Sequence, residues 1–179
     1  IDMPAKNSGG VAYINVWGTS SFASKYSPAF AYHNQVGGPD NIAEVVSHEL
    51  GHNLGLSHDG TSTSGYFTGQ GSGMISWAPI MGAGYYAQLS QWSKGEYPNA
   101  NQIEDDIAII SAKLSPIADD HSNVRSGATP LVIDSTGHIF ASTPATSPLD
   151  LSKVNKGIIA TRTDVDVFSF NTGAGNVVL

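Results

Sequence analysis

The chain of 179 residues contains no cysteine. This absence excludes disulfide bonds, cysteine-ligated zinc sites and thiol nucleophiles. Lysine and arginine are also scarce, with 8 residues against 15 aspartates and glutamates, and the formal net charge is −7. A chain with so little positive charge lacks the electrostatic surface that binds nucleic acid or an anionic membrane. We therefore expect neither as a partner.

Long apolar runs are absent as well, because no stretch approaches the roughly 20 residues that a membrane-spanning helix needs. The sequence begins with IDMPAKNSGG, which has neither a start methionine nor the features of a signal peptide. We interpret the chain as a processed or excised piece of a longer protein. Its length suffices for one good core, or for one domain and part of another.

Two strands and two helices are predicted in the first part of the chain. GGVAYINVWG is typical of a buried central strand, and SPAFAYHNQ of a more exposed one. A helical pattern follows, with Asp40 as its expected N-cap and Gly55 at its end. NANQIEDDIAIISAKL has the apolar spacing of a second, amphipathic helix.

The texture of the sequence changes near residue 118. Short apolar runs punctuated by Gly and Pro follow, in PLVIDSTGHIFA, KGIIATRTDVDVFSF and GNVVL. Such runs are typical of short β-strands. We therefore predict a boundary between a first domain, residues 1–118, and a second, β-rich one, residues 119–179.

Three of the six histidines lie in VVSHELGHNLGLSHDG. His48 and His52 are four residues apart, so on a helix they share one face and can bind the same ion. If the helix ends at Gly55, which tolerates a positive φ, the chain can reverse and bring His58 to the same point. Three protein ligands leave the fourth position of a tetrahedral Zn²⁺ for water, as in a catalytic site.

Glu49 follows His48 and is not needed as a ligand. It is placed to take a proton from the zinc-bound water, whose pKa the metal lowers to roughly 7. A bare HExxH occurs by chance in many unrelated chains, but HExxHxxGxxHD on a helix that ends at its glycine is far more specific. The pattern therefore predicts a zinc site with Glu49 as its general base.

SHELGHNLGLSHD followed by PIMG resembles the metzincin zinc endopeptidases. Asp59, directly after the third histidine, makes the chain most similar to the adamalysin or reprolysin-like branch, as found in secreted bacterial enzymes. The resemblance implies an α+β fold, in which a twisted sheet, a long zinc-binding helix, a Met-turn and a C-terminal helix form the catalytic domain. It also implies a secreted location and a protein or peptide substrate.

Met81 matches the methionine of the family's Met-turn, which forms an apolar floor beneath the zinc ligands; Met74 is the alternative. The resemblance places the edge strand that binds extended substrate in SPAFAYH. It also places walls of the pocket for the residue after the scissile bond in the helix and in residues 82–86.

The chain departs from the family pattern at three points. The resemblance starts at the family's third strand, so we expect two strands and a helix in front of Ile1. We expect these missing segments to be partners of residues 1–179. Without them, residues 1–179 should not fold alone. Ala83 occupies the position where some metzincin branches carry a tyrosine as a switchable fifth ligand, and we interpret Tyr85 and Tyr86 as packing residues. Many adamalysin-type enzymes have disulfides, and this chain has none.

ADDHSNVRSGATPL and GIIATRTDVDVFSFNTGAG are similar to the opening of the bacterial pre-peptidase C-terminal domain. This resemblance implies a partial all-β sandwich in residues 119–179. Four carboxylates there offer oxygen ligands for Ca²⁺: Asp119, Asp120, Asp164 and Asp166. The alternative, which we favour, is that they are solvated loop residues. The remaining histidines, His33, His121 and His138, lack metal spacing and are interpreted as surface residues.

Together these patterns predict a secreted zinc endopeptidase in which Glu49 activates water and then passes the proton to the leaving amine. Two alternatives remain. One is an inactive or autolysed remnant that keeps zinc. The other is a binding module in which the β-rich tail docks protein or polysaccharide and the zinc is structural.

Overall fold

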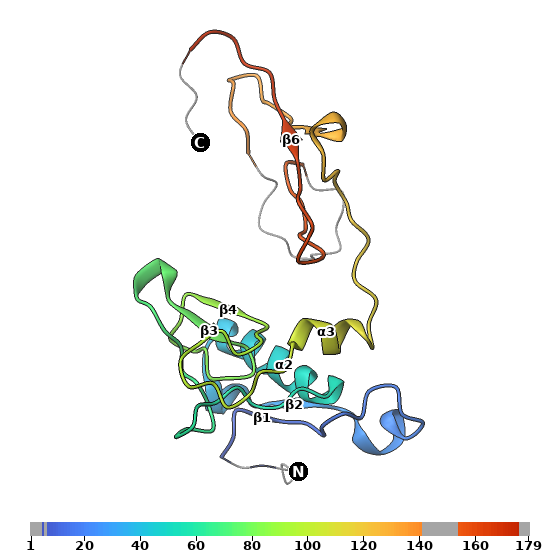
Figure 1. Cartoon of the computed structure of the whole chain (residues 1–179), viewed down its shortest axis with the longest axis vertical. Coiled ribbons are helices and arrows are strands. Elements are labelled where there is room, and N and C mark those ends of the chain that lie inside the picture. Colours follow the sequence, from blue (N-terminus) through green and yellow to red (C-terminus); the bar gives the residue numbers. More distant parts are fainter. Residues whose placement is uncertain (1–4, 6, 141–153, 176–179) are drawn as a thin grey trace. The chain divides into compact units, whose positions relative to one another are not determined.

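The computed structural model describes residue 5, residues 7–140 and residues 154–175. The chain divides into two compact units, Ile1–Ser115 and Pro116–Leu179 (Figure 1). Unit 1 mixes helices with small sheets and is an α+β arrangement. The functional division into domains 1–118 and 119–179 stays a prediction.

Short strands and one long helix make up unit 1. β1 (Gly10–Val11) pairs antiparallel with β2 (Phe30–Ala31), and β3 (Trp77–Pro79) pairs parallel with β4 (Leu89–Gln91). The helices are α1 (His33–Val36), α2 (Pro39–Leu54) and α3 (Asp106–Ser111), with a π-helical turn at Phe22–Tyr26 and a 3₁₀ turn at Gly73–Ile75. α2 packs against β1, β2, α1 and α3, so it is the central element of the unit.

The long helix α2 ends where the sequence predicts but begins earlier. Its N-cap is Gly38 and Pro39 occupies the first turn, so the prediction of Asp40 as N-cap is wrong. Proline suits this position because its fixed φ and missing N–H cost nothing there. Gly55 is confirmed as the end of the helix: it has a φ of 110°, and its N–H donates to the carbonyls of Gly51 and His52.

The first predicted strand, GGVAYINVWG, is much shorter than expected. Only Gly10–Val11 pairs as a strand, and Asn15 takes a positive φ of 58°. The segment then turns onto the C-terminal end of α2, where Asn15 donates to the carbonyl of His52 and Val16 and Trp17 donate to that of Asn53. The last carbonyls of a helix lack partners within it. Capping them competes with strand pairing and ends the strand.

The second amphipathic helix is also shorter than its pattern. α3 covers Asp106–Ser111, and Ile103, expected on its apolar face, is 77% exposed. The side chain of Asp105 caps the helix by accepting from the N–H of Ala108 at 3.0 Å. This local bond starts the helix at Asp106 and leaves the preceding residues outside it.

The core of unit 1 lies around the C-terminal half of α2. Its buried apolar side chains come from every part of the unit: Val16, Tyr32, Val45, Leu54, Leu56, Ala78, Met81 and Tyr97. Among the described residues, no helix is both long enough and apolar enough to cross a membrane.

The described part of unit 2 has little regular structure. β5 (Thr129–Pro130) pairs parallel with β6 (Phe168–Ser169), and a 3₁₀ turn covers Arg125–Gly127. Except for Gly175, the predicted strand GNVVL lies outside the described residues. The partial all-β sandwich therefore stays a prediction.

Candidate active site

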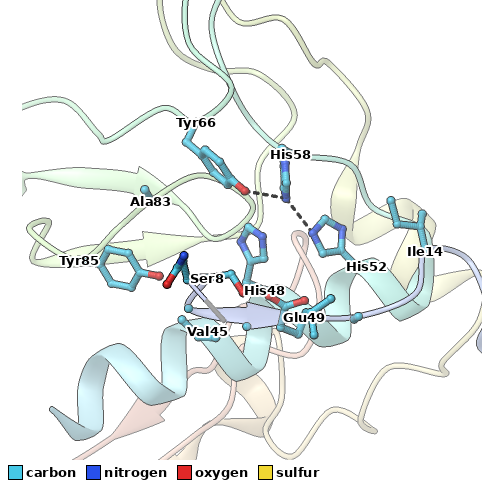
Figure 2. A pocket seen from close by; sticks show the side chains of 15 residues that line it. Ser8, Ile14, Val45, His48, Glu49, His52, His58, Tyr66, Ala83 and Tyr85 are labelled. Atoms are coloured by element: carbon cyan, nitrogen blue, oxygen red, sulfur yellow. Dashed lines mark hydrogen bonds between the residues drawn. The ribbon is translucent and has the colours of Figure 1, made fainter. Parts of the chain in front are cut away.

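Three histidines from two segments converge at the C-terminal half of α2. His48 and His52 lie one turn apart on the same face of the helix, with ring centroids 4.8 Å apart. Gly55 reverses the chain, and His58 returns to the same point, with its Nε2 2.9 Å from Nε2 of His52 (Figure 2). One ring nitrogen from each of the three lies within 4.8 Å of the others.

Two backbone carbonyls hold the helical histidines by their Nδ1 atoms. Nδ1 of His48 lies 2.8 Å from the carbonyl oxygen of Ile80, and Nδ1 of His52 lies 2.9 Å from that of Leu56. In a neutral imidazole, the nitrogen that faces a carbonyl must carry the proton, so the Nε2 lone pairs are free. Metal-bound histidines are typically oriented by this kind of contact. The three side chains therefore fit a metal such as Zn²⁺, which takes imidazole nitrogen ligands.

Burial also favours the protonation state that a ligand needs. It lowers the pKa of His48 to about 4, despite the contact with Ile80, which acts in the opposite direction. Burial likewise lowers the pKa of His52 and of the less buried His58. All three imidazoles are therefore neutral at physiological pH, and neutral imidazole is the form that binds metal.

The three histidines open into a cavity of about 550 Å³. One wall is the segment 7–12, which includes β1, and the other contains Tyr66, Ala83 and Tyr85 (Figure 2). The predicted substrate strand SPAFAYH does not line this cavity. Its residues 28–31 line a neighbouring cavity of about 250 Å³ that also reaches Glu49.

Glu49 lies in the wall of the cavity that contains the three histidines and is 6% exposed. Burial raises the pKa of its carboxyl to about 7. The carboxylate packs closely against β1: a Cβ on Gly10 would lie 2.6 Å from Oε1 of Glu49 and 2.6 Å from the carbonyl oxygen of Phe30. Glycine at position 10 is thus what allows strand and glutamate to meet.

Met81 lies in a tight turn beneath the helix. The N–H of Gly82 donates to the carbonyl of Pro79, which closes the turn, and Met81 is fully buried. A Cβ on Gly51 of α2 would come within 2.6 Å of the sulfur, so the missing side chain leaves room for the methionine. The alternative, Met74, is 88% exposed.

Tyr66 lines the cavity of the three histidines, and the sequence does not single it out. Its hydroxyl lies 3.3 Å from Nε2 of His58, and the two rings pack with centroids 4.4 Å apart (Figure 2). Tyr66 comes from GTSTSGYFTGQGSG, whose composition indicates no more than a loop. Ala83, two residues after Met81, lines the cavity without a polar group.

A buried polar network, which the sequence does not indicate, surrounds the residue after the third histidine. Asp59 accepts from the hydroxyls of Ser93, at 2.9 Å, and Tyr97, at 3.2 Å. Asp106 accepts from the N–H of Ser93 at 2.9 Å, and Glu104 from that of Ser57 at 2.6 Å. The network ties the segment of His58 to the start of α3.

The carboxylates considered as ligands for calcium, a reading that the sequence does not favour, are partly brought together in unit 2. Oxygens of Asp119, Asp164 and Asp166 lie within 4.8 Å of one another, whereas Asp120 is not in the group. Asp119 and Asp164 already accept from the backbone N–H groups of His121 and Ala160. These bonds fit loop residues, and calcium gains no support.

His121 differs from the expected surface histidine. Its ring nitrogens contact the hydroxyl of Thr129 at 2.7 Å and the carbonyl of Lys156 at 2.6 Å. The ring also packs on Phe168, with centroids 4.6 Å apart. His121 therefore connects the segments of unit 2.

Comparison with known families supports the chemistry that this geometry suggests. The model of metallo-peptidase family M12 matches residues 3–93 of the chain. This range is just over half of the 179 residues and contains the three histidines, Glu49 and Met81. No curated protein and no solved structure matches the chain.

Proposed function

The chain belongs to metallo-peptidase family M12, and from this premise we propose that it is an endopeptidase that uses a zinc ion held by His48, His52 and His58. Three imidazole nitrogens converge in a cavity that also contains Glu49, and this juxtaposition carries the proposal. Bound there, zinc would polarise the peptide carbonyl and lower the pKa of water.

Glu49 is the residue that moves the proton. It lines the cavity beside the histidines but is not one of the three converging ligands. Its carboxylate takes a proton from the attacking water and delivers it to the nitrogen of the leaving amine. The first transfer requires the ionised carboxylate, and the second requires the protonated carboxyl group that the first one leaves.

Tyr66 supplies a second polar group to the reacting atoms. Its hydroxyl faces Nε2 of His58. Once this nitrogen is committed as a ligand, the phenol O–H is free to donate to the peptide carbonyl oxygen, which gains negative charge during attack. A donor preplaced in this way stabilises the charge without reorganisation.

The turn that contains Met81 positions the histidine ligands. It carries the carbonyl of Ile80, which contacts Nδ1 of His48, and the carbonyl of Met81 accepts from the N–H of Asp59. The turn therefore positions both the first and the third histidine. Thioethers suit softer ions than Zn²⁺, so the methionine serves as packing and not as a ligand.

We also propose that the enzyme is secreted and belongs to the bacterial adamalysin-like branch. Support comes from the motif SHELGHNLGLSHD and from the resemblance of residues 119–179 to a domain that trails secreted bacterial proteases. Detection of the protein in the culture medium of its host, and not in the cell fraction, is the expected result.

The test combines metal content with hydrolysis. The chain is tested alone and in a version extended at its N-terminus. After purification without chelator both should contain one zinc, and at least the extended version should cleave a denatured protein substrate. Chelation should abolish cleavage, and added zinc should restore it. Zinc without cleavage in this chain, and in a version extended at its N-terminus, would favour the binding module. Absence of zinc would contradict the metal site itself.

A further inference from the structure

A second cavity is next to the cavity of the histidines and shares Tyr85 with it. It has a volume of about 540 Å³ and is formed between α2 and residues 84–90. Tyr85 lines both cavities. A peptide bound in the first cavity can therefore place one of its side chains in the second.

The second cavity is acidic. Asp40 and Glu44 are among its lining residues, together with uncharged polar side chains such as Asn41, Gln88 and Ser90. Among the described residues that line it, none is a lysine or an arginine.

Glu44 is held in place but incompletely satisfied. Its Oε2 accepts from the hydroxyl of Ser90 at 2.6 Å. Its Oε1 is buried and has no hydrogen-bond partner in the part of the chain that the structure describes. A Cβ on Gly84 would lie 2.7 Å from Oε1, so the carboxylate packs directly against the backbone there. A carboxylate with one buried oxygen that has no donor is costly to keep ionised, and a cation in the cavity that donates to the accessible Oε2 would offset this cost.

The position of Glu44 connects it to the reaction. It precedes His48 by four residues and thus lies on the same face of α2, one turn before the metal site. Burial raises the pKa of the Tyr85 hydroxyl, and the carboxylates of both Glu44 and Glu49 raise it further. Tyr85 is therefore within electrostatic range of both.

We propose that Glu44 makes the enzyme select substrates with a lysine or arginine side chain next to the bond that is cut. The cation enters the second cavity and donates to the carboxylate of Glu44, while the peptide backbone crosses Tyr85 to reach the histidines. This inference rests on the proposed function and adds its substrate class.

Binding is tested separately from cleavage. The probes are two dye-labelled peptides that are identical except for a central lysine or norleucine. They are titrated by fluorescence anisotropy against the zinc-loaded chain that carries Glu49→Gln, which should bind peptides without cutting them. We expect the lysine peptide to bind about 10-fold more tightly, the effect of one charge-assisted hydrogen bond. Glu44→Gln should reduce this ratio to less than about twofold.

Two further variants separate the carboxylate from general effects. Ser90→Ala removes the hydroxyl and keeps the carboxylate, so the preference for lysine should persist. Glu96→Gln removes a charge from an exposed residue outside the cavity and should leave binding unchanged. If the two peptides bind equally well to the chain that keeps Glu44, or if Glu44→Gln keeps the preference while Glu96→Gln behaves as expected, the inference is wrong.

Digestion of a mixed peptide library completes the test. Cuts should be enriched for lysine or arginine beside the scissile bond, and Glu44→Gln should remove the enrichment. Cleavage without enrichment contradicts the role of Glu44 and leaves the peptidase intact. A binding preference for lysine without any cleavage contradicts the proposed function and leaves the cation site intact.

Discussion

At the scale of single residues, Glu49 carries the clearest expectation. Glu49→Gln keeps the shape of the side chain but cannot accept a proton from water. Because Glu49 is not among the converging ligands, zinc content should be unchanged. Turnover of a fluorogenic peptide should fall by about 10²–10⁴-fold. Near-normal turnover in a variant that retains zinc would show that another group is the base.

Tyr66 provides a second residue-scale prediction. Tyr66→Phe removes the hydroxyl that faces His58 and retains the ring that packs on it. We expect kcat to fall by roughly 10–100-fold with little change in KM, because the lost donor acts on charge that develops during the reaction. Zinc content should not change, and a phosphinic peptide inhibitor should bind more weakly.

Tyr86→Phe is the matched control, because Tyr86 is 88% exposed. It should behave like the unaltered chain in all these measurements. Loss of zinc from Tyr66→Phe would instead mean that the tyrosine only supports the ligand His58.

The histidines could be predicted from the sequence, and the tyrosine could not. Helical periodicity alone puts His48 and His52 on one face, and the glycine at position 55 indicates the reversal toward His58. Tyr66 reaches the cavity through bonds of its loop: the N–H of Phe67 donates to the carbonyl of Asp59, and the hydroxyl of Ser64 to that of Tyr66. Such contacts depend on the folded path of the chain and leave no periodic pattern.

At the scale of elements, the contact between α2 and the turn of Met81 can be tested by replacing the methionine with a side chain of different shape. Met81→Leu nearly conserves volume, so it should lower the free energy of unfolding by less than about 1.5 kcal/mol and leave zinc bound. Urea denaturation and metal analysis measure the two effects. Loss of zinc in a variant of near-normal stability would contradict a packing role for the methionine.

Element boundaries are where sequence patterns and structure differ most. The apolar pattern of residues 11–17 suits a strand, yet the free carbonyls of α2 recruit its N–H groups. Similarly, Ile103 fits the apolar spacing of the predicted helix. The capping bond of Asp105, however, starts α3 only at Asp106. In both places a backbone or capping hydrogen bond overrides the period of the side chains, because a buried polar group left without a partner costs about 1–3 kcal/mol.

At the scale of the whole molecule, the buried aspartates should make stability depend on pH. Burial, together with the charges of Asp59 and other nearby carboxylates, raises the pKa of Asp106 to about 7. A folded-state pKa above the unfolded value of about 3.9 means that the folded chain binds more protons. This contribution is fully present below the unfolded pKa and is lost as the pH rises to about 7.

Asp106→Asn removes this titration. Relative to the variant, the unaltered metal-free chain should lose roughly 2–4 kcal/mol of unfolding free energy between about pH 4 and pH 7. Comparing urea denaturation of the two chains cancels the titration of the histidines and of Glu49. A difference that does not change with pH would show that Asp106 is ionised throughout.

The cap that Asn15, Val16 and Trp17 place on α2 has a consequence for how the molecule opens. Their N–H groups occupy the carbonyls of His52 and Asn53, and the side chain of Asn53 in turn donates to the carbonyl of Tyr13. Neither segment can detach without breaking bonds of the other, so the two should exchange their amide hydrogens with solvent as one cooperative unit. The irregular stretch before the helix should then be as slow to exchange as the last turn of the helix, and any ligand that binds His52 should slow both together.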